Sequence, residues 1–373
     1  MSASLSVLLD GARASDATTP PAAAVPSADP RARLVLGSLG LALAGAMLFS
    51  VGVGAVAIEP TQVIAILAAS VGLETPWAYE AQQALVLTGI RLPRVLLGAL
   101  VGAALSVSGA LMQGLFRNPL ADPSLIGVSS GAALGAATMI VLGGTLLGGV
   151  LLGALGIAVA AFGGGLVVTV IVYRIATRGR RTSVATMLLA GIALNALCGA
   201  GTGALVLLSN DGQLRDLTFW TLGSLGGATW GTLAVVAPLA GIALAATPRL
   251  ARALNALLLG ESEARHLGIN TERVKRTVIA LSALAVGAVT AVSGLIGFVG
   301  LVVPHLIRLA FGPDHRLLLP ASALLGATLL VATDLFARIL IAPAEIPIGI
   351  LTALGGAPFF LALLLRGQRR SAL

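Results

Sequence analysis

Charged residues are scarce in this sequence. Only 10% of the 373 residues are Asp, Glu, Lys or Arg, whereas 57% are apolar. Charges this sparse cannot cover the surface of a water-soluble globule, but a bilayer solvates apolar side chains and requires only that the backbone be hydrogen-bonded internally. The composition therefore excludes an ordinary soluble domain and predicts an all-α polytopic membrane protein.

Lysine, cysteine and histidine are nearly missing as well. Lys275, the only lysine, lies in "RVKRTV" and not in a G-x-x-x-x-G-K-[ST] loop, so the chain does not bind ATP by that route. Cys198 has no partner for an internal disulfide and lies in an apolar run, which predicts a small buried side chain. His266, His305 and His315 lie in separate segments, so no metal site and no bound cofactor are expected.

The net charge of +8 comes from arginines in short patches between apolar runs, a pattern that argues against nucleic-acid binding. The positive-inside rule places these patches (174–181, 249–276 and 366–370) in the cytoplasm, together with both termini. Four arginines then fall on the outer side as exceptions: Arg91, Arg94, Arg215 and Arg338.

Windows of about 20 apolar residues predict ten transmembrane helices in a domain over 31–373. They lie near 34–58, 92–115, 124–143, 146–173, 184–208, 229–247, 276–296, 298–311, 317–341 and 347–366. Residues 1–30 are rich in Ala, Ser, Thr and Pro without an apolar period, which predicts a flexible tail. Gly294, Gly297, Gly300 and Pro304 predict a broken helix in 292–311.

Two segments of the chain resemble each other. "VGAALSVSG" at 101–109 is similar to "VGAVTAVSG" at 286–294, and five predicted spans separate the two. An odd offset turns the second copy upside down, as in transporters with inverted repeat halves, where the solute passes between the halves.

The chain offers no energy source of its own. Asp334 and Arg338 are one helical turn apart and are expected to form an intrahelical pair rather than a coupling site. The predicted loop at 251–270, "ARALNALLLGESEARHLGIN", is amphipathic and is expected to form a short helix at the membrane face, which Gly268 closes. Such a helix either rests on the bilayer or meets a partner that supplies energy.

Four long motifs are the most specific feature of the sequence: "RLPRVLLGALVGAALSVSGALMQGLFRNPLADPSLIGVSSGAALG" (91–135), "LLLGESEARHLGI" (257–269), "GLIGFVGLVVPHLIRLAFGPDHRLLLPASALLGA" (294–327) and "AEIPIGILTALGGAPFFLALLLR" (344–366). They resemble the FecCD family, the permeases of ATP-binding-cassette (ABC) importers for iron-siderophores, haem and cobalamin. The resemblance implies a homodimer of ten-span subunits in the bacterial inner membrane, with a pore along the dimer axis. It also implies two cytoplasmic ATP-binding subunits, which hold ATP and Mg, and a periplasmic substrate-binding protein.

The same resemblance implies roles for particular residues. The residues expected to couple to the ATP-binding subunits are Glu261, Ala264, Arg265 and Gly268. Those expected to dock the binding protein are Arg91, Arg94 and Arg338. Those expected at the cytoplasmic gate and inner mouth are Asn118, Leu120, Thr182, Ser183 and Val184.

The solute is expected to be haem, with a ferric siderophore or cobalamin as the alternatives. Phe219, Trp220 and Trp230 are predicted at the outer side, where they form an aromatic belt or a face for a planar porphyrin. His305 is interpreted as a structural residue that caps broken-helix carbonyls rather than as a haem ligand. The rival functions are a secondary carrier or channel, which would need ionisable residues at depth, and an intramembrane enzyme, which would need a reactive dyad.

Overall fold

The computed structural model describes residues 30–371, except 55, 147–153 and 180. The tail predicted at 1–30 therefore lies outside the described residues, apart from Pro30, which is the first residue of α1.

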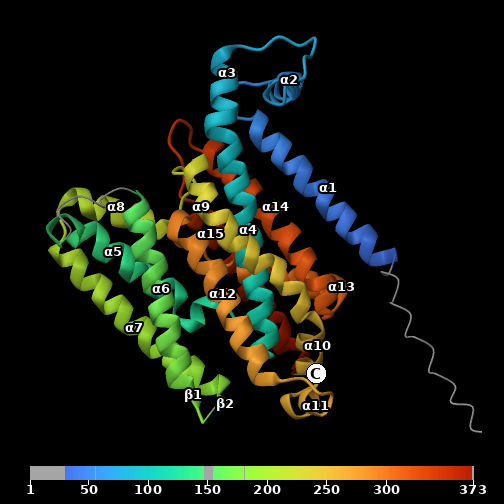
Figure 1. Ribbon diagram of the computed structural model, residues 1–373, viewed down its shortest axis with the longest axis vertical. Coiled ribbons are helices and arrows are strands. Elements are labelled where there is room, and N and C mark those ends of the chain that lie inside the picture. Colours follow the sequence, from blue (N-terminus) through green and yellow to red (C-terminus); the bar gives the residue numbers. More distant parts are fainter. Residues whose placement is uncertain (1–29, 55, 147–153, 180, 372–373) are drawn as a thin grey trace, which may run out of the picture.

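The described chain is almost entirely helical (Figure 1). Its first half contains α1 (Pro30–Gly52), α2 (Pro60–Ser70), α3 (Ala81–Val86), the π-turn η1 (Leu87–Arg91), α4 (Leu92–Phe116), the 3₁₀ turn η2 (Pro123–Ile126), α5 (Val128–Leu146) and α6 (Ala154–Ala176). A two-stranded hairpin of β1 (Thr177–Arg178) and β2 (Arg181–Thr182) leads to α7 (Val184–Leu208) and α8 (Asp211–Leu222). The remainder comprises α9 (Trp230–Ala246), η3 (Thr247–Leu250), α10 (Ala251–Leu259), α11 (Glu261–His266), α12 (Thr271–Ser293), α13 (Val299–Phe311), α14 (His315–Ile339) and α15 (Ile348–Ser371).

The apolar windows correspond to helices. Within the described part of the chain, seven helical stretches are long and apolar enough to cross a membrane, and they contain α1, α4, α6, α7, α9, α12 and α14. The other three predicted spans correspond to α5, α13 and α15, whose apolar stretches are shorter. The multi-span α-helical architecture is thereby confirmed, and the count of ten crossings stays a prediction.

Helices α4, α12 and α14 form the centre of the bundle, because they bury the largest shares of their apolar windows. Small residues let their backbones approach closely. At Gly109 in α4, an added Cβ would collide with the carbonyl oxygen of Gly300 in α13. The chain runs downward in α4 and upward in α12 (Figure 1), so the two similar segments are antiparallel, as an inverted repeat requires.

The predicted break lies between α12 and α13. Gly294 (φ 68°) ends α12, and Phe298 (φ 66°) precedes α13 in the left-handed region. The prediction that Gly300 and Pro304 also break the helix is wrong, since both lie inside α13. Proline removes a backbone donor, but the side-chain amide of Gln113 donates to the carbonyl oxygens of Gly300 and Leu301, both at 3.3 Å, and satisfies the freed acceptor.

Three short helices, α2, α3 and α8, had no counterpart among the predicted spans. Each begins with a reciprocal capping box, formed by Glu59 with Gln62, Glu80 with Gln83, and Asn210 with Gln213. All three lie near the upper end of the bundle in Figure 1. A window of span length cannot detect helices of this size.

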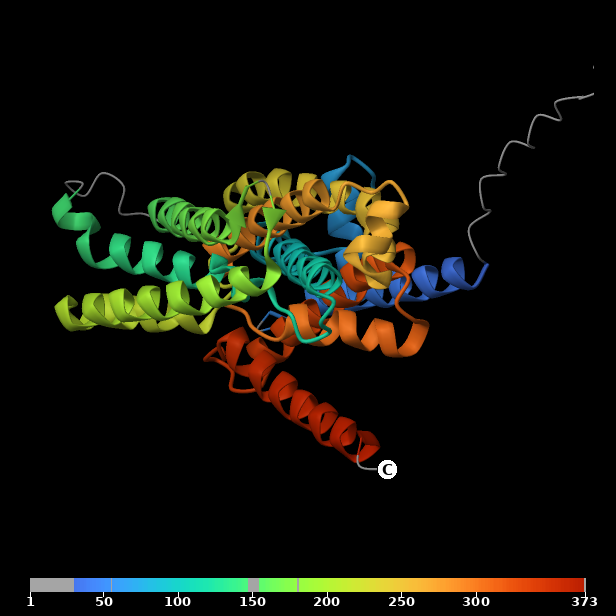
Figure 2. The same ribbon diagram turned by 90° about the horizontal axis from the view of Figure 1, so that it is seen from below.

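Large apolar side chains remain uncovered on the outer helices. Examples on α7 are Leu189, Ile192, Leu197 and Leu207, each more than half exposed. Helix α15 contacts α13, α14 and α8 and then leads away from the bundle (Figure 2). Faces of this kind are stable only against lipid tails or another apolar surface.

Candidate functional site

The lower end of the bundle in Figure 1 carries a groove of about 750 Å³, here called the lower groove. The hairpin β1–β2 and the start of α7 form one side, and α11 with the start of α12 forms the other. Its lining includes Thr182, Ser183, Glu261, Arg265 and Lys275. The structure thus brings predicted gate residues and predicted coupling residues together at one site.

Lys275 joins the two sides of the lower groove. Its ammonium donates to the carbonyl oxygen of Thr182 at 2.8 Å, to the Glu261 carboxylate at 2.9 Å and to Glu272 at 3.2 Å. Glu272 also accepts from the backbone N–H of Thr182 at 2.8 Å. Lys275 and Glu272 were not among the predicted site residues. The available signals were the uniqueness of the lysine and its spacing of three residues from Glu272.

Helix α11 is held by its neighbours on one face and is open on the other. Ala264 has no exposed surface and packs in the core cluster that contains Leu254 and Leu257. Ala264 therefore anchors α11 to the rest of the bundle. Gly268 (φ 79°) donates its N–H to the Arg265 carbonyl at 2.9 Å and closes the helix as predicted.

The five predicted gate residues fall into two groups. Thr182, Ser183 and Val184 line the lower groove, and Ser183 caps α7 by accepting from the N–H of Thr186 at 3.2 Å. Asn118 and Leu120 lie in the connection after α4, where the Asn118 side chain accepts from the N–H of Leu120 at 2.9 Å. The first group lines the lower groove, whereas Leu120 lines a different cavity.

A second cavity of about 370 Å³ lies between the connection after α4 and the break that precedes α13. Leu120, Asp122 and Ser124 line it from the connection after α4, and Phe298 and Gly300 line it from the break before α13. Asp122 caps η2 by accepting from the N–H of Ser124 at 2.9 Å, and Pro123 occupies the first position of this turn, where its missing N–H has no cost. We call this the break cavity.

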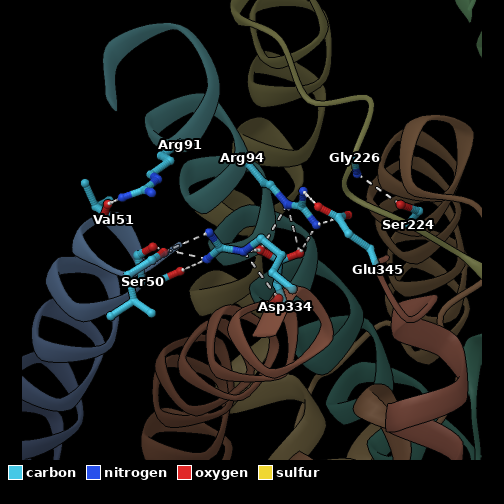
Figure 3. Close-up of polar contacts among 10 residues, drawn as sticks. Ser50, Val51, Arg91, Arg94, Ser224, Gly226, Asp334 and Glu345 are labelled. Carbon is cyan, nitrogen blue, oxygen red and sulfur yellow. Dashed lines mark hydrogen bonds and ion pairs between the residues drawn. The ribbon is translucent and has the colours of Figure 1, made fainter. Parts of the chain in front are cut away.

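The upper end of the bundle carries a buried network of charges (Figure 3). Arg94 on α4 binds Asp334 on α14 through Nε and Nη2, at 3.0 and 2.9 Å, and binds Glu345 through Nη1 and Nη2, at 2.9 and 2.8 Å. Asp334 also pairs with Arg338 at 3.2 Å, which confirms the predicted intrahelical pair. Because the guanidinium group of Arg94 binds both carboxylates, it fixes α14 and the segment before α15 to α4.

The predicted docking arginines are all engaged within the chain itself. Arg91, 4% exposed, donates to the carbonyl oxygens of Val51 and Gly52, both at 2.8 Å. Arg338 donates to the Ser50 carbonyl at 3.1 Å and to its hydroxyl at 2.6 Å. Docking through these groups would require an incoming carboxylate to replace internal partners.

Glu345 is the accessible member of the upper network, with its side chain 44% exposed. The hydrogen bonds from Arg94 lower the pKa of this carboxyl group, against the opposing effect of partial burial. The carboxylate is therefore charged throughout the neutral range, and it is more exposed than Arg94, Asp334 and Arg338.

His305 does not cap carbonyls, so this part of the interpretation is wrong. Within the described part of the chain, neither ring nitrogen has a hydrogen-bond partner, and the ring lies edge-on to Phe359 at 6.4 Å. Among the described residues, no three His, Cys, Asp or Glu side chains gather as a metal site needs. Cys198 is buried as predicted.

The predicted outer aromatics do not share one environment. Trp220 packs against buried clusters that contain Leu217 and Ala291. Phe219 and Trp230 are about half exposed, and the Trp230 indole donates to the Thr88 carbonyl at 2.8 Å.

These features define a multi-span membrane transport subunit, with a cavity beside the helix break that precedes α13 and a charged groove at one end. Comparisons with known proteins identify its family. The chain belongs to the FecCD transport family, whose model matches residues 42–366.

Its relatives are permeases of ABC importers, as this chain is. It is 47% identical to the hemin transport system permease protein HmuU of Yersinia pestis over 340 residues, which cover 91% of this chain and 97% of that protein. It is 44% identical to the cobalamin import system permease protein BtuC of Halobacterium salinarum, over 76% of this chain and 74% of that one. A solved inward-facing structure of a metal-chelate-type ABC transporter matches with a TM-score of 0.78 and 33% identity, over 89% of this chain and 99% of that one.

Proposed function

We propose that this permease moves haem from the periplasm to the cytoplasm by alternating access. The observation that carries the proposal is the similarity to the hemin permease, which has the highest identity of the three comparisons and spans nearly the whole length of both proteins. In this proposal the chain is not a catalyst and binds no cofactor, and ATP and Mg are bound by two cytoplasmic partner subunits. A periplasmic binding protein delivers the solute.

The charge distribution supports a cytoplasmic assignment for the lower end. The hairpin β1–β2 and the segments around α10 and α11 lie there (Figure 1) and carry Arg178, Arg181, Arg252, Arg265 and Arg273. Short loops rich in arginine stay on the cytoplasmic side of a membrane. We therefore place the lower groove at the surface that meets the ATP-binding subunits, and the upper network in the periplasm, in the bacterial inner membrane.

The pathway is assigned to a homodimer axis, with ten spans and inverted repeat halves in each copy. Apolar side chains left uncovered on α7 support a second copy at that face, and the break cavity supports a solute path at the meeting of the halves. Thr182 and Ser183 precede α7 and Val184 is its first residue, so motion of α7 would open or close the inner mouth.

A ferric siderophore or cobalamin is the second candidate solute, because the cobalamin permease is only slightly less similar. The test is uptake by proteoliposomes that contain the chain, its ATP-binding subunits and its binding protein, with haem, ferrichrome and cobalamin offered separately. ATP-dependent accumulation of haem alone supports the proposal. Accumulation of ferrichrome or cobalamin without haem would contradict the haem assignment and keep the family.

A further inference from the structure

Lys275 is a buried cation in a protein that otherwise does without lysine. The residue is 2% exposed, although it lies in the second turn of α12 beside the lower groove. Burying an ammonium group is costly unless its three hydrogens find acceptors, and here all three do. A methionine of similar length would fill this space without a charge, so packing alone does not explain the lysine.

The three acceptors come from three different segments. The Thr182 carbonyl belongs to the chain that enters α7, Glu261 begins α11, and Glu272 lies in the first turn of α12. The Thr182 backbone is held on both sides, because its N–H donates to Glu272 and its carbonyl accepts from Lys275. The entrance to α7 is therefore fixed to α12 by two hydrogen bonds and is joined to α11 through a shared ammonium.

Of the three contacts of Lys275, the one to Glu261 of α11 can break without leaving either residue unpaired. The Glu261 carboxylate is one-third exposed and also accepts from Arg265 of its own helix, at 3.2 Å. If α11 moves away, Glu261 keeps Arg265 as a partner, and Lys275 keeps Thr182 and Glu272. Every charged group thus keeps at least one partner in both arrangements, although Lys275 loses one of its three acceptors when α11 moves away. Two alternative sets of contacts are the property a two-state element needs. The other charged groups that line this groove are Arg178 and Arg181 on the hairpin.

We propose that Lys275 is a positioning residue that transmits movement of α11 to the residues that precede α7. The proposal rests on the proposed function, in which an ATP-binding subunit contacts α11. With Glu261 bound, the position of α11 sets the position of the Thr182 carbonyl, and hence of Ser183 and Val184 at the inner mouth. With Glu261 released, α11 moves without α7, and ATP hydrolysis no longer drives opening.

The experiment measures the solute accumulated per ATP hydrolysed in proteoliposomes that contain the complete importer. Haem, ferrichrome and cobalamin serve as parallel probes, so that the wild-type result first tests the proposed function. The test variant is Lys275→Met and the matched control is Arg273→Met, which also removes one positive charge from the start of α12 but at an exposed position.

We expect Lys275→Met to lower the transport-to-hydrolysis ratio on the order of fivefold or more, as loss of an allosteric link does, with hydrolysis retained. Arg273→Met should keep the wild-type ratio. Glu261→Gln should reproduce the loss, and the double variant should be no worse than Lys275→Met alone. Lys275→Arg retains the charge and should recover part of the ratio.

Three results would overturn the proposal. One is an unchanged ratio in Lys275→Met. Another is an equal fall of transport and hydrolysis in both Lys275→Met and Glu261→Gln, which indicates a role in assembly only. The last is an additive effect in the double variant. If the wild-type complex shows no ATP-dependent uptake of any probe, the proposed function fails instead.

Discussion

Replacing Arg94 by leucine tests the energetic role of the upper network. The change leaves Asp334, whose side chain is 2% exposed, without its main partner. Removing one member of a buried ion pair typically costs about 3–5 kcal/mol, because the other charge stays buried and uncompensated. Arg338 remains 3.2 Å from Asp334, and Glu345 is exposed enough to be hydrated, so the expected loss is at the lower end of that range, about 3 kcal/mol.

The assay is equilibrium unfolding by SDS in mixed micelles, followed by circular dichroism. The variant Arg94→Leu is compared with Arg215→Leu, which removes an exposed arginine on α8 and should change stability by less than about 0.5 kcal/mol. Adding Asp334→Asn to Arg94→Leu removes the buried carboxylate charge that Arg94 no longer neutralises. The double variant should regain on the order of 1 kcal/mol of the free energy of unfolding. A loss in Arg94→Leu no larger than in Arg215→Leu would refute the reasoning, and so would a double variant that is less stable than Arg94→Leu.

Three further predictions concern separate parts of the molecule. Gly109→Ala should destabilise the protein by about 1–3 kcal/mol in the same unfolding assay, because the added Cβ collides with the Gly300 carbonyl. Gly199→Ala is the control and should be neutral, because the space around Gly199 is open. Equal effects of the two variants would contradict the close contact between α4 and α13. Glu345→Gln should be less stable than the wild type at neutral pH, because the lowered pKa of Glu345 shows that its charged form is stabilised in the folded protein. This stability difference should be fully present above the ordinary glutamate pKa of about 4.3 and should vanish as the pH falls through the lowered pKa of Glu345. A difference that does not depend on pH would show that the charge is not involved. Gly268→Val should reduce transport per ATP hydrolysed, because a β-branched residue is strained at a φ of 79° and alters the end of α11, and unchanged coupling would remove Gly268 from the coupling surface.

The spans could be predicted from the sequence because lipid imposes a simple constraint. A bilayer requires about 20 apolar residues per crossing, and the predicted 184–208 window coincides with α7. Short helices such as α2 and α8 escape this rule, since they are defined by caps. A helix break was wrongly predicted at Pro304, because Gln113, a residue distant in sequence, donates the hydrogen bond that the Gly300 carbonyl would otherwise lack.

The site was predictable in its segments but not in its contacts. The motif at 251–270 and the basic segment before α7 were both singled out from the sequence, and residues of both line the lower groove. The pairing of Lys275 with Thr182, 93 residues earlier, depends on how α12 packs beside the hairpin, and no local pattern specifies this. The arginines expected to face a partner are similarly held by Asp334, Glu345 and backbone carbonyls, because the fold brings α1, α4 and α14 together.

The proposed function makes this chain the solute pathway of an ATP-driven haem importer. It is tested most directly by haem accumulation in sealed proteoliposomes, measured with the complete complex and with ATP-binding subunits that bind but cannot hydrolyse ATP. Accumulation of haem against a gradient is expected only with hydrolysis-competent subunits and only when the binding protein is outside the vesicles. Haem accumulation without hydrolysis, or by the chain without its partners, would contradict it.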